Sequence, residues 1–199
     1  MSASACGDDA GEPSTTSSIP AASTTPGRPG NGQAAAALAN AIDAVGDQYA
    51  FTSTITAEGV LVTQVDGTLS GDTGLYVVQS GGATLEYIIS PDGRWVREPQ
   101  ADWVRLPGPA PVGAPLAVLA TPISVEVAQP DDPSRLRATY DGRSLGFGEG
   151  AVEVEITIRS GMLAEIEYVV SLGDGQGSVI VVTTIDGDAE IDPIPAPDA

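Results

Sequence analysis

The side chains in this sequence that could do chemistry are carboxylates. The chain has 27 acidic residues and eight basic ones, all arginine, with no histidine and no lysine. The commonest general base and the Schiff-base amine are therefore absent. Glu153 with Glu155, and Glu165 with Glu167, form two carboxylate pairs of the kind that glycosidases use. Both pairs alternate with apolar residues, as solvated side chains of a strand do. We therefore expect no enzyme activity.

A further acidic segment, IDGDAEID at 185–192, alternates as some calcium loops do. An EF-hand also needs Gly at its sixth position and Glu at its twelfth, where this chain has Ile191 and Pro197. We therefore predict no metal and no cofactor. The formal net charge of −19 excludes nucleic acid as a partner, because phosphate binding needs a basic patch. A bare anionic membrane surface would also repel the chain.

The only cysteine, Cys6, follows the small residues Ala3-Ser4-Ala5. This pattern looks like a bacterial lipobox, whose cysteine receives a diacylglyceryl anchor, although Ala3 stands where Leu is usual. We expect the first residue of this sequence to lie inside the true signal peptide, whose start is upstream. The alternative is a cytosolic chain with an accidental pattern, in which Cys6 is an exposed thiol without a role. Residues 7–33 are rich in Gly, Ser, Thr, Pro and Ala, so we predict that residues 1–33 form a disordered tether.

Hydrophobic spacing predicts the folded elements that follow the tether. Residues 34–48 carry Leu38, Ile42 and Val45 on one helical stripe, which predicts an amphipathic helix that ends near Gly46. From residue 49 the period changes to two, which predicts antiparallel hairpins, with Asp92-Gly93 as the clearest turn. Asp141-Gly142 and Ser160-Gly161 are two further predicted turns. The predicted strands of this half are 49–57, 60–70, 75–79, 84–90 and 94–98.

The second half of the chain begins with a short predicted helix at 115–120, PLAVLA, which would form a lid. Alternation predicts strands at 152–158 and 164–170, each with one buried face. Residues 178–185 are almost continuously apolar, which predicts a strand covered on both sides, with the N-terminal helix on its second face. The predicted fold is α+β and mostly β. A strongly curved antiparallel sheet of about ten strands wraps around a helix over residues 34–195, followed by a disordered tail, 196–199.

A curved sheet has a concave side, where an apolar cavity remains if the lid does not fill it. Trp95 and Trp103, each in a Trp-Val-Arg triplet, are candidates for the rim of this cavity, with core packing as the alternative. Alternation also selects candidates for the cavity walls, and a filled core is again the other interpretation. These wall candidates are Phe51, Ile55, Leu75, Val77, Tyr87, Ile89, Ile166 and Tyr168.

Several features occur in the order and spacing of a known family. These are Cys6 ahead of the tether, the opening helix, the hairpin YIISPDGRW at 87–95, the lid segment 116–119, and the closing series from Gly161-Met162-Leu163 to Pro193. The chain resembles the LolA-like half-barrel proteins, and particularly the LppX/LprAFG group of actinobacterial envelope lipoproteins. The resemblance covers roughly residues 34–195.

This resemblance implies a hydrophobic cavity that binds lipids or lipoglycans and passes them across the cell envelope. It implies no catalytic residues, and it makes Cys6 the lipidation site that would hold the domain at the outer face of the cytoplasmic membrane. The alternative is a non-enzymatic envelope sensor or protein-interaction module with a filled core. Such a module would bind an envelope protein through a sheet edge or the lid.

Overall fold

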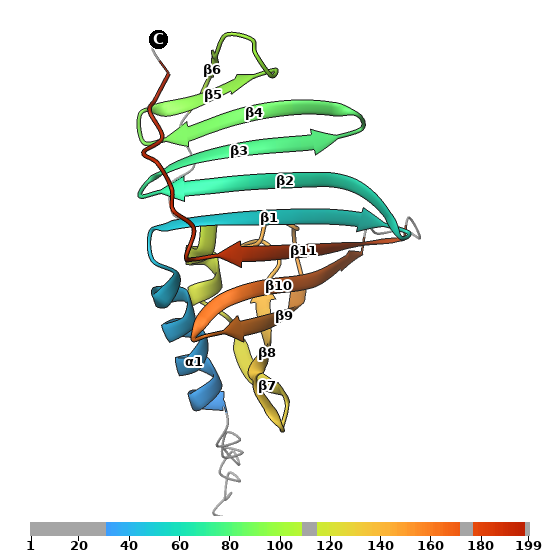
Figure 1. Cartoon of the computed structure of the whole chain (residues 1–199). Helices are drawn as coiled ribbons and strands as arrows, with labels where there is room; N and C mark the ends of the chain where they lie inside the picture. The colour runs from blue at the N-terminus through green and yellow to red at the C-terminus, as the bar shows by residue number, and fades with distance from the viewer. Residues whose placement is uncertain (1–30, 109–114, 172–176, 198–199) are drawn as a thin grey trace, which may run out of the picture.

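The structure, a computed structural model, describes residues 31–108, 115–171 and 177–197. Within these ranges the chain is mostly β, with one open antiparallel sheet of eleven strands, one α-helix and one 3-10 helix. The strand order is β6-β5-β4-β3-β2-β1-β11-β10-β9-β8-β7 (Figure 1). The strands are β1 (Gln48–Ala57), β2 (Val60–Ser70), β3 (Thr73–Ser80), β4 (Ala83–Ser90), β5 (Gly93–Arg97), β6 (Val104–Leu106), β7 (Ser124–Gln129), β8 (Asp132–Asp141), β9 (Ala151–Arg159), β10 (Met162–Ser171) and β11 (Ser178–Asp186).

The chain builds this sheet as two meanders that meet in the middle. Strands β1 to β6 follow one another to one edge, and the segment containing η1 (Pro115–Ala120) then leads to β7 at the opposite edge. Strands β7 to β11 return to the centre, where β11 pairs with β1. Phe51 lies at this junction, opposite Gly67 on β2 and Ile185 on β11. The first strand, β1, and the last strand, β11, therefore lie side by side.

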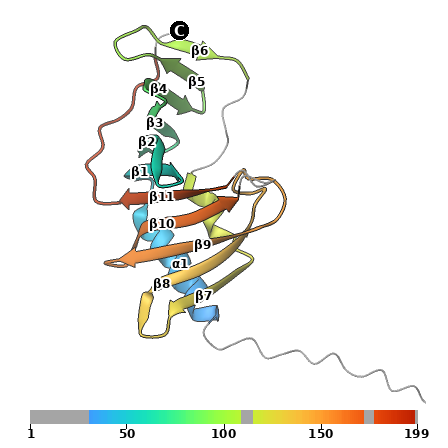
Figure 2. The same cartoon turned by 90° about the vertical axis from the view of Figure 1, so that its right-hand side faces the viewer.

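The helix α1 (Asn31–Val45) covers only one half of the sheet. Its buried residues Ala34, Leu38, Ala41 and Val45 follow the helical period, and α1 packs against β7, β8, β10 and η1. Gly46, with φ of 73°, ends the helix. In Figures 1 and 2 the helix lies beside β7 to β10, whereas β2 to β6 extend away from it. The predicted helix is confirmed: it ends at Val45, next to the predicted Gly46, and it begins at Asn31, three residues before the predicted start.

The prediction that β11 is covered on both faces is wrong. Val181 and Ile185 are buried on one face, but Ile180 on the other face is 40% exposed. The helix contacts β10 and the strands beyond it instead. The turn prediction at Ser160-Gly161 is confirmed, because both residues have positive φ and join β9 to β10 directly. Asp141-Gly142 instead opens a nine-residue loop before β9.

Two further features complete the arrangement. Residues 187–197 run from β11 past the ends of β1 to β4 toward β5, as Figures 1 and 2 both show. No helix in the part of the chain that the structure describes is long and apolar enough to cross a membrane. Cys6, nearly all of the predicted tether and the end of the predicted tail lie outside the described residues.

Candidate functional site

An apolar cavity of about 260 Å³ lies on the helix-bearing side of the sheet, between the strands β1, β10 and β11 and the segment η1. Tyr49, Leu116, Leu119, Ile166 and Ile185 belong both to its walls and to the hydrophobic core that includes α1. None of its lining residues is charged. The full lining is Tyr49, Phe51, Ser53, Leu116, Val118, Leu119, Ser144, Leu145, Ile166, Tyr168, Thr183 and Ile185.

Strand alternation and register place the floor of this cavity. Tyr49, Phe51 and Ser53 are two residues apart on β1, so their side chains point to the same side of the sheet. Ser53 lies opposite Thr183 on β11, and the Thr183 hydroxyl lies 3.0 Å from the Ser53 hydroxyl. Ile166 of β10 lies opposite Thr183 in turn. The floor therefore combines apolar side chains with a pair of hydroxyls, as is usual in small-molecule sites.

The segment η1 closes one side of the cavity and is tied to the sheet by Tyr140. Tyr140 of β8 is fully buried, and its hydroxyl donates a hydrogen bond of 3.0 Å to the carbonyl oxygen of Leu119. Leu116 and Leu119 of η1 are themselves buried in the core. Burial raises the pKa of Tyr140 to about 12, so the hydroxyl stays a donor at neutral pH. The predicted lid segment is thus present as a short 3-10 helix.

Aromatic rings extend the floor from the cavity toward β3. The ring centroids of Tyr49 and Phe51 are 6.5 Å apart, and those of Phe51 and Tyr76 are 6.0 Å apart. Phe51 lies across Gly67, where an added Cβ would overlap its ring. Burial raises the pKa of Tyr49, and the neighbouring Tyr76 adds to this effect. The row of rings continues the apolar surface beyond the part that η1 covers.

The structure divides the predicted wall residues between the two faces of the sheet. Directly paired residues of neighbouring strands point to the same side. Phe51 pairs with Gly67, Gly67 with Tyr76, and Tyr76 with Tyr87, so these four positions share the cavity side. The predicted residues on the cavity side are Phe51, Ile55, Tyr87, Ile89, Ile166 and Tyr168, of which Phe51, Ile166 and Tyr168 line the cavity. Leu75, Val77 and Trp95 lie on the opposite face.

The opposite face carries a separate groove of about 370 Å³, to which Leu75 and Val77 contribute. Its other lining residues include Asp66, whose carboxylate accepts hydrogen bonds of 2.8 Å from Thr52 and Gln64. This groove is larger than the cavity, but no helix covers it in the described part of the chain. We therefore treat the cavity beneath η1 as the candidate site.

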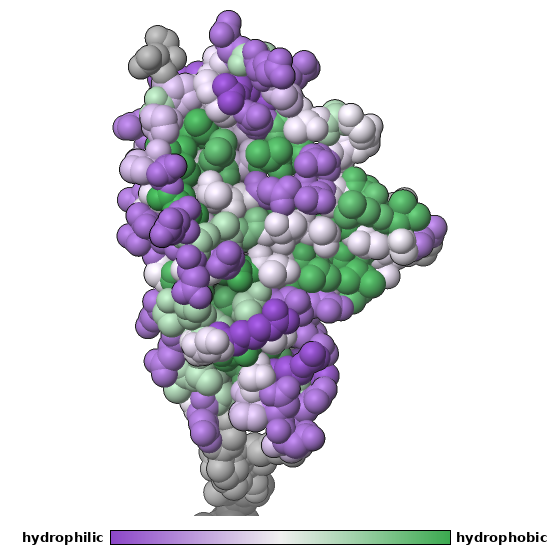
Figure 3. All heavy atoms as spheres, in the orientation of Figure 1, coloured by the Kyte–Doolittle hydropathy of each residue, from purple (hydrophilic) through white to green (hydrophobic). Residues whose placement is uncertain are grey.

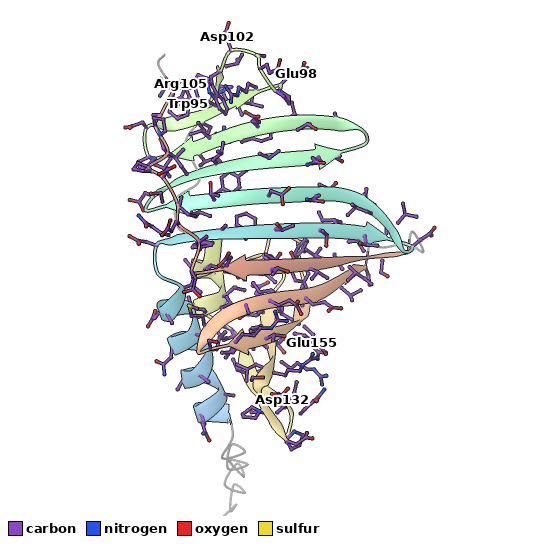
Figure 4. The ribbon with its side chains drawn as sticks, viewed as in Figure 1. Trp95, Glu98, Asp102, Arg105, Asp132 and Glu155 are labelled. Atoms are coloured by element: carbon purple, nitrogen blue, oxygen red, sulfur yellow. The ribbon has the colours of Figure 1, made fainter. Side chains whose placement is uncertain are left out.

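The two tryptophans lie away from the cavity, at the β5–β6 end of the sheet. The Arg105 guanidinium lies 5.7 Å from the ring centroid of Trp95, and the Arg97 guanidinium lies 4.2 Å from that of Trp103. Arg97 also pairs with Glu86 of β4 at 2.6 Å. Figure 4 shows Trp95 and Arg105 together near the free edge of the sheet, far from Glu155 in the other half. These contacts join β4, β5 and β6 rather than forming a rim of the cavity.

The carboxylate pairs also lie outside the cavity. Arg137 of β8 contacts Glu153 at 3.3 Å and Glu155 at 3.4 Å. Glu165 contacts Arg159 at 3.8 Å, and all these side chains are at least partly exposed on the outer face. The described residues contain no group of three or more acidic or cysteine side chains that could hold a metal ion. Glu153, Glu155 and Glu165 therefore form cross-strand ion pairs.

Sequence reasoning missed several wall residues. Leu116, Val118 and Leu119 were predicted only as part of the lid. Their place in the cavity wall follows from the position of that lid. Leu145 and Ser144 had no such signal, because the long β8–β9 loop brings them there through hydrogen bonds such as that from the Phe147 amide to the Gly142 carbonyl, at 2.8 Å.

No model of a known protein family matches this chain, and no curated protein matches it either.

Proposed function

We propose that this chain is a non-enzymatic carrier that binds a lipid or lipoglycan in a half-barrel of the LolA-like kind. In this proposal a lipid on Cys6 anchors it at the outer face of the cytoplasmic membrane, within the bacterial cell envelope, and it passes its ligand between membranes. The observation that carries the proposal is the uncharged cavity of about 260 Å³ beneath η1. An acyl chain binds through non-directional hydrophobic contacts, and the walls of this cavity provide them.

The size of the cavity favours a ligand that is only partly enclosed. Its volume lies just below the range of about 300–1,000 Å³ that is usual for small-molecule pockets, so it would hold part of one acyl chain. The same face continues past Tyr76 onto β2 to β5, where five half-buried side chains are apolar and no described helix covers them. These side chains are Val65, Val78, Leu85, Tyr87 and Val96. A long ligand would extend along them.

The segment η1 is the element that would move to admit the ligand. Its half-buried Val118 faces the cavity, and the Tyr140 hydroxyl holds its last turn through a single hydrogen bond. Breaking this one hydrogen bond costs only about 0.5–1.5 kcal/mol net. Full opening would also expose the buried Leu116 and Leu119, at about 1.5–3 kcal/mol each, so a local shift of the last turn and Val118 is the cheapest movement. The hydroxyls of Ser53 and Thr183 would then contact polar atoms next to the acyl chain.

Native mass spectrometry of the full chain, purified from its own membrane-containing lysate, tests this proposal. We expect a co-purifying lipid that organic extraction releases and identifies. The variant Val118→Trp fills the cavity and should lose the lipid. The matched control Ile123→Trp, at a position 67% exposed before β7, should keep it.

A chain without lipid, which also takes up none from added lipid extract, would refute the carrier proposal. That result would leave the envelope sensor or protein-interaction module as the better explanation of the fold. Equal lipid content in both tryptophan variants would show that the ligand binds elsewhere, and the groove that includes Leu75 and Val77 would be the next candidate.

A further inference from the structure

The two ends of the central strands differ in charge. At one end, each connection from α1 to β1, β2 to β3 and β4 to β5 carries an aspartate, and so does the end of β11. These residues are Asp47, Asp72, Asp92 and Asp186. At the other end, the twenty-four residues 55–63, 79–84, 169–171 and 177–182 contain one charged residue, Glu58, and the intervening sequence 172–176 adds Asp174. Figure 1 shows these ends at the left and right of the central strands.

This end, which carries little charge, also holds most of the exposed large hydrophobic side chains among the described residues. Five of the eight large hydrophobic side chains that are exposed lie there, with exposed fractions from 40% to 66%. Figure 3 shows apolar surface gathered at this corner of the molecule. We call it the apolar tip, formed by Val60, Leu61 and Val62 of β2, Val169 of β10 and Ile180 of β11.

The apolar tip presents hydrophobic side chains on both faces of the sheet. Leu61 pairs with Thr56, Thr56 with Ile180, and Ile180 with Val169, so the three apolar residues form a row on one face. Val60 pairs with Ala57, which is adjacent to Thr56 and therefore belongs to the other face. A protein partner that docks on a sheet covers one face, whereas a bilayer surrounds a tip that enters it.

We propose that the apolar tip is a membrane-contact site that inserts into the boundary between headgroups and acyl chains. Burial of exposed apolar side chains in this region drives interfacial binding. The net charge of −19 makes anionic lipids repel the chain. When the apolar tip faces the membrane, the aspartate-bearing end points away from it, which weakens this repulsion. This inference goes beyond the proposed carrier function and needs no ligand in the cavity.

A second copy of the chain fits the apolar tip less well. A stable protein–protein interface buries about 1,200–2,000 Å² in total, with roughly 20–30 residues on each side. The apolar tip offers five hydrophobic side chains at the narrow end of two hairpins. Contact between two tips would therefore bury too little surface to hold a dimer.

Vesicle flotation of the full chain, produced without lipid on Cys6, tests the proposal. The vesicles are phosphatidylcholine alone and an equal mixture of phosphatidylcholine and phosphatidylglycerol. We expect flotation with the first, and weaker flotation with the second because of charge repulsion. Leu61→Asp and Ile180→Asp should each lower the partition coefficient at least about tenfold, which corresponds to about 1.4 kcal/mol. Ile123→Asp, at a position 67% exposed before β7, should leave it unchanged.

Insertion itself is measured with an added tryptophan. The native Trp95 and Trp103 lie at the β5–β6 end, so Leu61→Trp adds a fluorophore at the tip alone. Its emission should shift to shorter wavelengths with vesicles and be quenched by brominated lipid, whereas Ile123→Trp should show neither effect. Circular dichroism establishes that each variant is folded.

Three outcomes would overturn the proposal. The first is no flotation of the unmodified chain with either vesicle, and the second is flotation that both aspartate variants retain. The third is a concentration-dependent dimer in sedimentation that Leu61→Asp dissociates, without any vesicle binding. That last result would assign the apolar tip to a second copy of the chain. None of these measurements depends on whether the cavity holds a lipid, so failure here is distinct from failure of the carrier proposal.

Discussion

Tyr140→Phe removes the single hydroxyl that ties η1 to β8 and keeps the ring. Tyr140 is 0% exposed and Leu119 is 4% exposed, so the carbonyl that loses its donor stays buried. Leaving one buried acceptor unsatisfied costs about 1–3 kcal/mol, more than the net worth of an average hydrogen bond. We expect the free energy of unfolding to fall by about 1–3 kcal/mol at neutral pH.

Urea unfolding measures this change with two probes. Far-UV circular dichroism reports the whole sheet, and tryptophan fluorescence reports the β5–β6 end, where Trp95 and Trp103 lie. The matched control is Tyr87→Phe, because Tyr87 is half-buried on β4 and its hydroxyl makes no hydrogen bond in the described structure. We expect that control to change the free energy of unfolding by less than about 0.5 kcal/mol.

Alkaline pH provides an independent check of the same hydroxyl. Its pKa is raised by burial to about 12 in the folded chain, whereas an unfolded tyrosine titrates near 10. Below pH 10 both states keep the proton, and above pH 10 the unfolded chain releases it first, so the wild type loses stability as pH rises toward 12. Phenylalanine has no such proton. The stability difference between wild type and Tyr140→Phe should therefore narrow between pH 10 and 12.

Two results would refute this reasoning. If Tyr140→Phe unfolds at the same urea concentration as Tyr87→Phe, the hydrogen bond to Leu119 does not hold η1 in solution. If the stability difference stays constant from pH 9 to 12, the Tyr140 hydroxyl is not buried in the folded chain as the structure places it.

Two further substitutions test the packing around the site and at the sheet edge. Gly67→Ala places a Cβ where the Phe51 ring lies, and the overpacking should cost about 1–3 kcal/mol in urea unfolding. Gly32→Ala, with nothing within 4 Å, should be neutral or stabilising, and an equal loss in both variants would contradict the overlap. Arg97→Gln removes both the cation over Trp103 and the ion pair with Glu86, which together should cost about 1–2 kcal/mol, and loss of the stacking should shift tryptophan emission to longer wavelengths. Unchanged emission would show that this stacking is absent in solution.

The strands could be predicted from the sequence because their signals are local. Val60–Ser70 begins and ends where the period-two pattern predicts, and the Ser160-Gly161 turn has the positive φ angles that its residue types favour. Asp141-Gly142 has the same signal and yet opens a loop. There the Gly142 amide donates to the Gly150 carbonyl at 2.7 Å, which closes the loop on itself. A dipeptide does not encode such a contact between distant residues.

The assignment of side chains to the cavity could be predicted only in part. On β3 both alternating sets are apolar, because Leu75 and Val77 point one way while Tyr76 and Val78 point the other. Alternation then says which residues share a face but not which face is concave. That choice depends on pairing with distant strands, and the rings of Tyr76 and Phe51 meet only after β1, β2 and β3 align.

The error about β11 has a physical reason that bears on the apolar tip. Continuous apolar runs indicate that both faces of a strand are removed from water, and Ser178–Asp186 has such a run. In the structure the helix covers neither Ile180 nor its neighbour Val169, and both remain exposed. A hydrophobic pattern does not distinguish a face covered by protein from one covered by lipid. An exposed patch of this kind marks an interaction site in a folded chain. If brominated lipid quenches the emission of the Leu61→Trp variant, the apolar run of β11 and the exposure of its outer face have one common explanation.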